Sequence, residues 1–242
     1  GVLSAIPNPM VLLSPLTFQE AVLSSRIEGT QATLGEVLEL EAGALPDDVD
    51  ERRRDDIQEV LNYRKALWLA IDQLKDLPLC GRVIKAAHAV LMEGVRGTHK
   101  APGQYRTTQN WIGPHGCTQE TARFVPIAPQ RLPEGMAAWE RYVHDDTVAD
   151  PLVQLAIVHA EFEALHPFCD GSGRLGRMLV PLYLVARGLL QRPAFYISAY
   201  IEAHREAYYD RLLAISRDGD WTGWCRYFLE AMIHQAEDNA AK

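Results

Sequence analysis

The stretch from His166 to Arg177, HPFCDGSGRLGR, constrains the fold and function of this chain more than any other segment. It gathers an imidazole, a carboxylate, two guanidinium groups and three glycines within twelve residues. Glycines placed where a helix begins let backbone N–H groups approach an anion, and the helix dipole adds to the attraction. Arg174 and Arg177 lie three apart and share one face of a first helical turn. The stretch predicts a phosphate-binding loop, with Asp170 beside a divalent cation and His166 as a proton acceptor.

Apolar residues at helical spacing flank this loop on both sides. Residues 151–165 run directly into it, and residues 174–188 lead away from it. The spacing G-x-G-x-x-G within the loop also fits a dinucleotide-binding fingerprint, but that fingerprint needs a preceding strand and an alternating strand–helix pattern. The sequence has neither here, so it argues against a Rossmann fold and keeps only the phosphate-binding glycine loop at a helix start.

Three possible metal ligands precede the loop. His159, Glu163 and His166 stand at i, i+4 and i+7, a spacing that would let them share a metal on an unbroken helix. However, Pro167 follows directly, and the spacing is not the H-E-x-x-H arrangement of zinc enzymes. A core histidine hydrogen-bonded to backbone is therefore the preferred interpretation of His159.

The rest of the chain predicts further helices around a short irregular segment. Residues 1–15 contain three prolines and predict an extended arm. A helix is expected from Thr17, as its N-cap, to Glu28, with Gly29 as its stop. Residues 105–127 are rich in Thr, Gly, Pro and Val and predict a small hairpin or flap. The remaining helices are expected over residues 34–41, 50–77, 82–92, 133–143, 199–217 and 221–236.

Composition excludes several classes of function. The 242 residues include 24 Lys and Arg against 32 Asp and Glu, a net charge of -8 at pH 7, which argues against general binding to nucleic acid or anionic membranes. Four cysteines at irregular spacing predict neither a zinc site nor a disulfide framework, and favour reduced thiols in a cytoplasmic protein. No apolar run reaches the length of a membrane span.

Two separate motifs resemble one known family. The central stretch resembles the signature of Fic-domain nucleotidyltransferases, H-x-F-x-[D/E]-G-N-G-R-x-x-R, at every position but one. The exception is Ser172, where the signature has asparagine. The second motif lies nearer the N-terminus. There, Ser24-x-x-x-Glu28-Gly29 is similar to the [S/T]-x-x-x-E-[G/N] motif of the inhibitory helix that some Fic proteins carry before the Fic core.

This resemblance implies a fold and an activity. The fold would be all-α, a Fic helical bundle with a small β-hairpin flap that aligns a target segment. The activity would be transfer of AMP from ATP to a Ser, Thr or Tyr hydroxyl of a target protein, either another protein or the chain itself. Whether the chain forms a homodimer is left open by the resemblance. The expected division is an N-terminal helical region, residues 1–80, with the inhibitory helix at about 17–29, and a Fic core with C-terminal helices, residues 81–242.

The resemblance also assigns roles to residues. His166 would take the proton of the attacking hydroxyl, and Asp170 would hold Mg²⁺ against the phosphates. Arg174 would bind the β-phosphate side and Arg177 the γ-phosphate, and Glu28 would pair with Arg177 and block the γ-phosphate site. Ser24 is the other regulatory residue. The remaining nucleotide-binding residues would be Gly171, Ser172, Gly173 and Gly176, the first three of them through backbone N–H groups.

Two alternatives to AMP transfer stay open at this point. The same site could remove AMP from a modified protein by hydrolysis, with Glu28 positioning a water. The chain could instead be a nucleotide-responsive interaction module with weak or no catalysis. Ser172 bears on both, because a serine offers one short hydroxyl where asparagine offers two donors and an acceptor.

Overall fold

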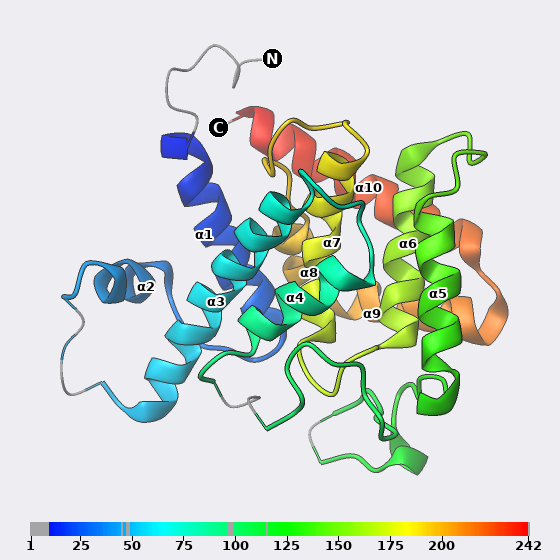
Figure 1. Cartoon of the computed structure of the whole chain (residues 1–242), viewed down its shortest axis with the longest axis horizontal. Helices are drawn as coiled ribbons and strands as arrows, with labels where there is room; N and C mark the ends of the chain where they lie inside the picture. The colour runs from blue at the N-terminus through cyan, green and yellow to red at the C-terminus, as the bar shows by residue number, and fades with distance from the viewer. Residues whose placement is uncertain (1–9, 45, 47–48, 96–98, 115, 242) are drawn as a thin grey trace.

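The computed structural model describes residues 10–44, 46, 49–95, 99–114 and 116–241. Within these residues the chain is built from α-helices, as the sequence predicts (Figure 1). In chain order they are α1 (Met10–Ile27), α2 (Leu34–Glu41), α3 (Glu51–Gln73), α4 (Gly81–Leu91), α5 (Leu132–Val143), α6 (Pro151–Leu165), α7 (Ser172–Ala186), α8 (Ser198–Ala203), α9 (Arg205–Asp218) and α10 (Trp221–Ala241).

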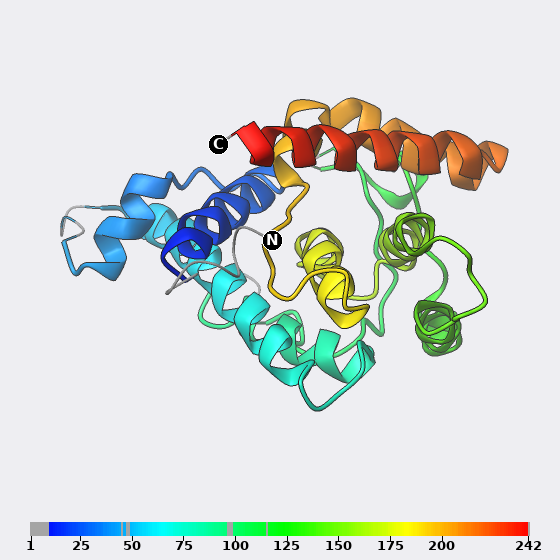
Figure 2. The ribbon, with the colours of Figure 1, turned by 90° about the horizontal axis from the view of Figure 1, so that it is seen from above.

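Helix α7 forms the centre of the molecule. Every residue from Ser172 to Leu184 is buried, including Arg174 and Arg177, and after Arg177 the helix is apolar on all sides, as expected for a buried helix. It packs against α1, α3, α4 and α6, and Figure 2 shows it in the middle of the bundle with α10 running along one side. The helix begins at Ser172 and not at Arg174 as expected, so the glycine loop feeds directly into its first turn.

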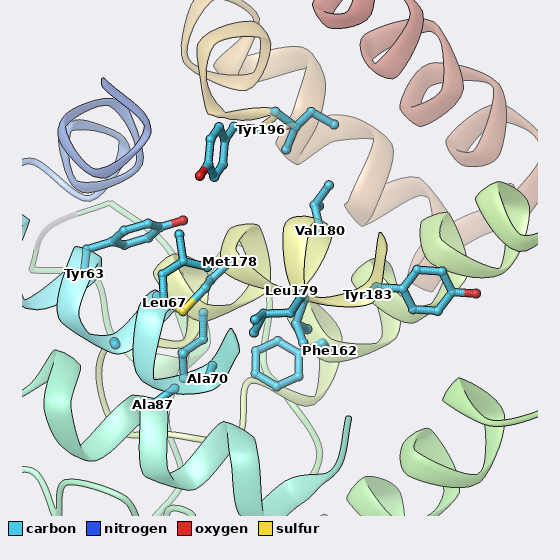
Figure 3. Packing of buried hydrophobic residues seen from close by; sticks show 14 of the residues in the cluster. Tyr63, Leu67, Ala70, Ala87, Phe162, Met178, Leu179, Val180, Tyr183 and Tyr196 are labelled. Carbon is cyan, nitrogen blue, oxygen red and sulfur yellow. The ribbon is translucent and has the colours of Figure 1, made fainter. Parts of the chain in front are cut away.

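The hydrophobic core is continuous around α7. Figure 3 shows Met178 of this helix near Leu67 of α3 and Leu179 near Phe162 of α6, while Val180 points from the opposite side of the helix. Each helix from α1 to α10 contributes buried apolar side chains to the same cluster. Full burial of one such side chain stabilises the fold by about 1.5–3 kcal/mol. No helix in the described part of the chain is both long and apolar enough to cross a lipid bilayer.

Helix α1 starts earlier than the sequence predicts. It runs from Met10 and includes Pro15, so the predicted extended arm is wrong for residues 10–15, and the rest of that arm lies outside the described residues. Thr17 is not an N-cap but lies inside the helix, where its hydroxyl and that of Tyr196 are hydrogen-bonded at 3.1 Å. Tertiary contacts outweigh the local cap and proline signals here. Gly29, with φ of 99°, follows the end of the helix as expected.

The predicted β-hairpin flap is wrong. Between residues 105 and 127 the described residues contain no strand, only an isolated antiparallel bridge between Ile112 and Phe124, whose backbones exchange hydrogen bonds of 2.8 and 3.0 Å. The neighbouring hydrogen-bonded pairs of such a ladder would need backbone N–H groups at Pro114 and Pro126, which proline lacks. The two prolines therefore confine the pairing to one bridge.

The end of the chain differs from expectation in one further detail. The helix expected over residues 199–217 is divided at His204, where φ of -122° and ψ of 36° leave the helical region, into α8 and α9. Helix α9 ends at Gly219 in the left-handed conformation, a common helix stop. This turn brings α9 back beside α10.

Candidate functional site

His166 stands at the turn that ends α6. It caps the helix in a left-handed conformation, φ 44° and ψ 64°, and its backbone N–H donates to the Phe162 carbonyl at 3.0 Å. That conformation is costly for a residue other than glycine. Burial lowers the pKa of the ring to about 4, so the imidazole is neutral at pH 7 and able to accept a proton. Its Nδ1 atom is buried without a hydrogen bond, and the residue lines the cavity described below.

Arg106 fixes the end of α6 from the irregular segment. Its guanidinium donates to the carbonyls of His166 at 2.9 Å, Leu165 at 3.3 Å and Ile127, and its backbone N–H donates to the Pro167 carbonyl at 2.9 Å. These bonds satisfy carbonyls that a helix C-terminus leaves without intrahelical partners. Arg106 belongs to no motif, so nothing in the sequence indicates this role. It ties the His166 turn to Ile127, close to the Ile112–Phe124 bridge in the chain.

His88 of α4 fixes the loop that follows. Its Nδ1 accepts the Gly103 N–H at 2.8 Å, which makes Nε2 the protonated nitrogen that donates to the Asp170 carbonyl at 3.0 Å. The ring also stacks on Phe168, with centroids 3.8 Å apart and planes 11° apart. Burial lowers the pKa of His88 to about 4, so this neutral tautomer persists at pH 7. Sequence reasoning missed His88, which looks like any residue on the inner face of α4.

The first turn of α7 presents free backbone donors. Gly171 has φ of 75°, and the first intrahelical bond runs from the Leu175 N–H to the Gly171 carbonyl at 3.1 Å. The N–H groups of Ser172, Gly173 and Arg174 therefore precede the helical ladder and have no intrahelical acceptor. Together with the helix dipole they form an anion site.

The Ser172 side chain serves the loop itself. Its hydroxyl accepts the Phe168 N–H at 3.1 Å and lies 3.3 Å from the Phe168 carbonyl, to which it donates. The side chain is buried, so it is closed off from any bound phosphate, while its backbone N–H stays available. The hydroxyl thus closes the turn that the motif requires.

Arg177 is held by α1. Its Nε donates to the Ser24 hydroxyl at 2.9 Å, and its Nη2 donates to the Ser24 carbonyl at 2.8 Å and to Glu28 Oε1 at 2.7 Å. The Arg177 side chain is 1% exposed, whereas Glu28 is 37% exposed. Burial works to raise the pKa of Glu28, but the Arg177 charge outweighs it and leaves that pKa below its ordinary value. The structure therefore brings together an ionised Glu28, Ser24 and Arg177 from segments about 150 residues apart.

Arg174 points elsewhere. Its Nη1 donates to Glu59 Oε2 of α3 at 3.1 Å, and its Nη2 lies 3.4 Å from Asp170 Oδ1. The Thr30 hydroxyl donates to the same Glu59 oxygen at 3.0 Å. Both charged side chains of the Arg174–Glu59 pair are buried. Sequence reasoning placed Arg174 beside Arg177 on one helical face, but Arg174 does not line the cavity that Arg177 lines.

Asp170 places one accessible carboxylate beside the start of α7. Its Oδ1 accepts the Gly171 N–H at 2.6 Å, and its Oδ2 is 3.7 Å from Lys100 Nζ, with the side chain 40% exposed. Among the described residues no group of three or more His, Cys, Asp and Glu side chains is arranged to hold a metal ion. Mg²⁺ is commonly bound by one or two carboxylates together with substrate phosphates. One accessible carboxylate beside an anion site fits that pattern.

A cavity of about 330 Å³ is lined by several of these groups, although not by Asp170, Ser172 or Arg174. Gly173 lines it together with six Glu, Arg and His side chains: Glu28, Arg123, Glu161, Glu163, His166 and Arg177. The apolar lining comes from the bridged segment and from the region of α9: Ile112, Phe124, Leu212, Leu213, Ile215 and Trp221. A cavity with polar groups at fixed positions and a largely apolar wall is typical of a small-molecule site.

Comparison with known proteins identifies the family. Residues 1–72 match the model of the Fic/DOC family N-terminal region, and residues 78–184 match the model of the Fic/DOC family. The chain belongs to the Fic/DOC family. The first match contains Glu28 and the second contains the whole Fic motif, so both sides of the Glu28–Arg177 pair lie in family segments.

Curated relatives of this Fic chain are named protein adenylyltransferases. A probable protein adenylyltransferase of Aquifex aeolicus is 36% identical over 86 residues, covering 36% of this chain and 27% of the relative. Protein adenylyltransferase fic-1 of Caenorhabditis briggsae is 25% identical over 159 residues, covering 61% and 28%. Protein adenylyltransferase Fic of Drosophila erecta is 23% identical over 216 residues, covering 88% and 40%. The chain therefore spans less than half the length of these relatives.

Solved Fic structures share the fold. A Fic family protein from Desulfovibrio desulfuricans superimposes with a TM-score of 0.76 at 25% identity, covering 93% of this chain and 64% of that one. A segment of Fic-1 from Caenorhabditis elegans gives a TM-score of 0.72 at 20% identity, covering 99% and 68%. The helices of this chain are thus arranged as in the Fic fold.

Two glycines of the Fic motif are explained by carboxylates packed over them. A Cβ built on Gly173 would collide with Glu28 Oε1, and one built on Gly176 would collide with the Glu163 carboxyl. The N–H of Gly176 lies beyond the first turn of α7, inside the helical ladder. Packing against Glu163 therefore accounts for Gly176, and its expected role in nucleotide binding remains a prediction.

Proposed function

We propose that this Fic chain is an autoinhibited protein adenylyltransferase, which transfers AMP from ATP to a hydroxyl side chain of a protein. One observation carries the proposal: the Glu28 carboxylate occupies Arg177 at 2.7 Å in the cavity that also holds the neutral His166 imidazole. A carboxylate on that guanidinium takes the place of a phosphate beside a ready-made anion site. The names of the relatives supply the reaction class.

The chemistry follows from the residues around the cavity. The N–H groups of Ser172, Gly173 and Arg174 hold the phosphates of ATP at the start of α7. The target hydroxyl oxygen then attacks the α-phosphorus while its proton passes to Nε2 of His166, and the bond to the β-phosphate breaks so that diphosphate leaves. A positioned base contributes about 10²–10⁴-fold to such a step. Mg²⁺ held by Asp170 would neutralise charge on the phosphates.

The apolar part of the cavity suits the nucleoside. Its volume of about 330 Å³ lies at the lower end of the roughly 300–1,000 Å³ typical of small-ligand sites. A flat base can stack against the apolar side chains from the bridged segment and the α9 region, while the phosphates reach the N-terminus of α7. This arrangement leaves ATP spanning the cavity from Trp221 to Gly173.

The same geometry supports autoinhibition. Arg177 cannot pair fully with a γ-phosphate while its Nη2 donates to Glu28 and Ser24. Moving such a two-state equilibrium from 1:99 to 99:1 needs about 5.5 kcal/mol of differential binding. The Glu28 carboxylate and the Ser24 carbonyl, which together hold one buried guanidinium, are therefore strong competitors for ATP in its productive pose.

The test replaces Glu28 by glycine. We expect Glu28→Gly to raise self-labelling from α-labelled ATP and Mg²⁺ by roughly 5–150-fold, the range of couplings of 1–3 kcal/mol. Arg26→Gly is the matched control, because it puts the same glycine at an exposed position two residues before Glu28, in the last turn of α1, and should leave labelling unchanged. His166→Ala in the Glu28→Gly background should abolish labelling. Undiminished labelling of that double variant would rule out His166 as the base.

Hydrolytic removal of AMP is the second candidate. The observation in its favour is the partial exposure of Glu28 within the cavity that His166 lines, where a carboxylate can position a water. In that case the unmodified chain should strip AMP from a labelled partner, and Glu28→Gly should not. The two reactions are thus separated by the sign of the Glu28→Gly effect.

A further inference from the structure

Two carboxylates share one face of α7. Gly173 and Gly176 are three residues apart, so their Cα atoms lie one turn apart on the same side of the helix. The Glu28 carboxylate packs over the first and the Glu163 carboxyl over the second. Arg177 follows in the next turn and pairs with Glu28. The bare glycine face thus admits a second acidic group, from α6, beside the first.

Glu163 is buried with an oxygen that has no protein partner. Its residue is 9% exposed, its Oε1 atom is buried without a hydrogen bond, and it lines the same cavity as Glu28, His166 and Arg177. An unpaired buried oxygen costs about 1–3 kcal/mol, so such groups are uncommon without a ligand or ordered water to satisfy them. This oxygen packs against Gly176 of α7, and because Glu163 also lines the cavity, a ligand bound there is the candidate partner for its carboxyl group.

The charges around Glu163 decide its protonation. It faces Arg177 from α7, Glu28 from α1 and the Tyr208 hydroxyl from α9, with His159 and His166 on its own helix segment. Burial raises the pKa of Glu163 to about 8, and the Glu28 charge adds to this rise, while Arg177 opposes it. One guanidinium therefore faces one ionised and one neutral carboxyl at pH 7.

We propose that Glu163 is a further nucleotide-binding residue, which as a neutral carboxylic acid donates a hydrogen bond to the phosphate that displaces Glu28 from Arg177. This inference rests on the proposed function. A phosphate oxygen accepts hydrogen bonds only, so an ionised Glu163 beside it would be an unpaired like charge. ATP carries more negative charge than the Glu28 carboxylate that it displaces. Bound ATP therefore keeps Glu163 protonated, and where Glu163 has already ionised, binding takes up one proton from solvent.

The experiment measures ATP binding against pH. In the Glu28→Gly background, where the competitor is absent, the Kd for ATP with Mg²⁺ is measured by calorimetry from pH 7 to 9.5. We expect Kd to rise by about tenfold per pH unit on the alkaline side, because one proton is bound with the ligand. Adding Glu163→Gln, which keeps a neutral donor of the same shape, should leave tight binding and a Kd that changes far less with pH.

Two further arms keep the result interpretable. Glu163→Asp still titrates but is shorter, so it should bind ATP more weakly and keep the pH dependence. Calorimetric titrations with ATP in two buffers of different ionisation enthalpy should show proton uptake by the Glu28→Gly variant and none once Glu163→Gln is added. If the Kd for ATP changes equally with pH whether residue 163 is Glu or Gln, this inference is overturned, while AMP transfer by the Glu28→Gly variant still stands. Absence of ATP binding at every pH would overturn the proposed function, and this inference with it.

Discussion

At the scale of single residues, Ser172 shows how the motif tolerates its one departure. The sequence alone suggests the loss of a side-chain contact to phosphate. In the structure the hydroxyl bonds both the N–H and the carbonyl of Phe168 and closes the loop. The anion site depends on backbone N–H groups, which the substitution leaves in place. The expected consequence of serine is thus a change in loop rigidity more than in phosphate contacts.

Ser172→Ala tests this role. The substitution leaves the buried Phe168 N–H without its acceptor, which should lower the free energy of unfolding by about 1–3 kcal/mol. Ser25→Ala is the matched control, because Ser25 is equally buried but its hydroxyl has no hydrogen-bond partner, so its loss should be near neutral. Urea denaturation of both variants gives the comparison. Equal losses of stability would mean that the Ser172 hydrogen bonds do not hold the loop.

At the scale of elements, the position of α1 sets the Glu28–Arg177 contact on which the proposed inhibition depends. A buried carboxylate anchors this helix two turns before Glu28: Glu20 Oε1 accepts the Ser198 hydroxyl at 2.6 Å and the Tyr63 hydroxyl at 3.0 Å. Its Oε2 accepts the Ser198 N–H at 3.3 Å. These bonds tie α1 to both α3 and α8. The Glu28–Arg177 pair therefore depends on contacts far from the cavity.

Glu20→Ala should activate the enzyme without touching the site. Loss of the anchor leaves the Ser198 and Tyr63 donors unpaired, which destabilises the docked position of α1 and with it the Glu28–Arg177 pair. We expect self-labelling from ATP to rise by several-fold to tenfold, less than for Glu28→Gly. Gln19→Ala, at the exposed neighbouring position, is the control. Unchanged labelling together with a lower melting temperature would show that Glu20 supports the fold and not the inhibition.

The elements also show what the sequence can and cannot predict. Apolar spacing predicted the bounds of α6, because long periodic helices carry a strong local signal, while the all-α class followed from the resemblance to the Fic family. Local signals failed for α1, where the buried environment of Thr17 overrides a cap signal, and for the hairpin, where Pro114 and Pro126 remove the donors of a ladder. His88 and Arg106 belong to no sequence motif, and Glu163 stood out only as one of three possible metal ligands. The contacts of these three residues arise only when distant segments pack together in the fold.

At the scale of the whole molecule, the burial that builds the site also sets its pH limits. Helix α7 is buried along most of its length, and the polar groups packed around it must stay neutral or paired. His88, His159 and His166 are three such groups, each with its pKa lowered by burial, to about 4, 3 and 4 respectively. Lowering the pH therefore destabilises the fold by favouring protonation of histidines packed around α7, the helix that also carries part of the candidate site.

His159 gives the clearest test of this coupling. Its Nδ1 lies 2.9 Å from the Gly176 carbonyl and its Nε2 lies 2.8 Å from the Tyr208 hydroxyl. Its folded pKa of about 3 lies below the unfolded value of about 6.5, so the unfolded chain binds the extra proton as pH falls between them. That proton should remove about 1.4 kcal/mol of stability per pH unit in this window.

We therefore expect His159→Asn to be less stable at pH 7 but to lose stability more slowly than the unmodified chain from pH 6 to pH 4. The difference in slope should be about 1.4 kcal/mol per pH unit, read from urea denaturation at each pH. The unfolded carboxylates and the other buried histidines are common to both chains and cancel. His204→Asn, at an exposed position, should keep the original slope. Parallel curves for His159→Asn and the unmodified chain would place the acid sensitivity elsewhere than at His159.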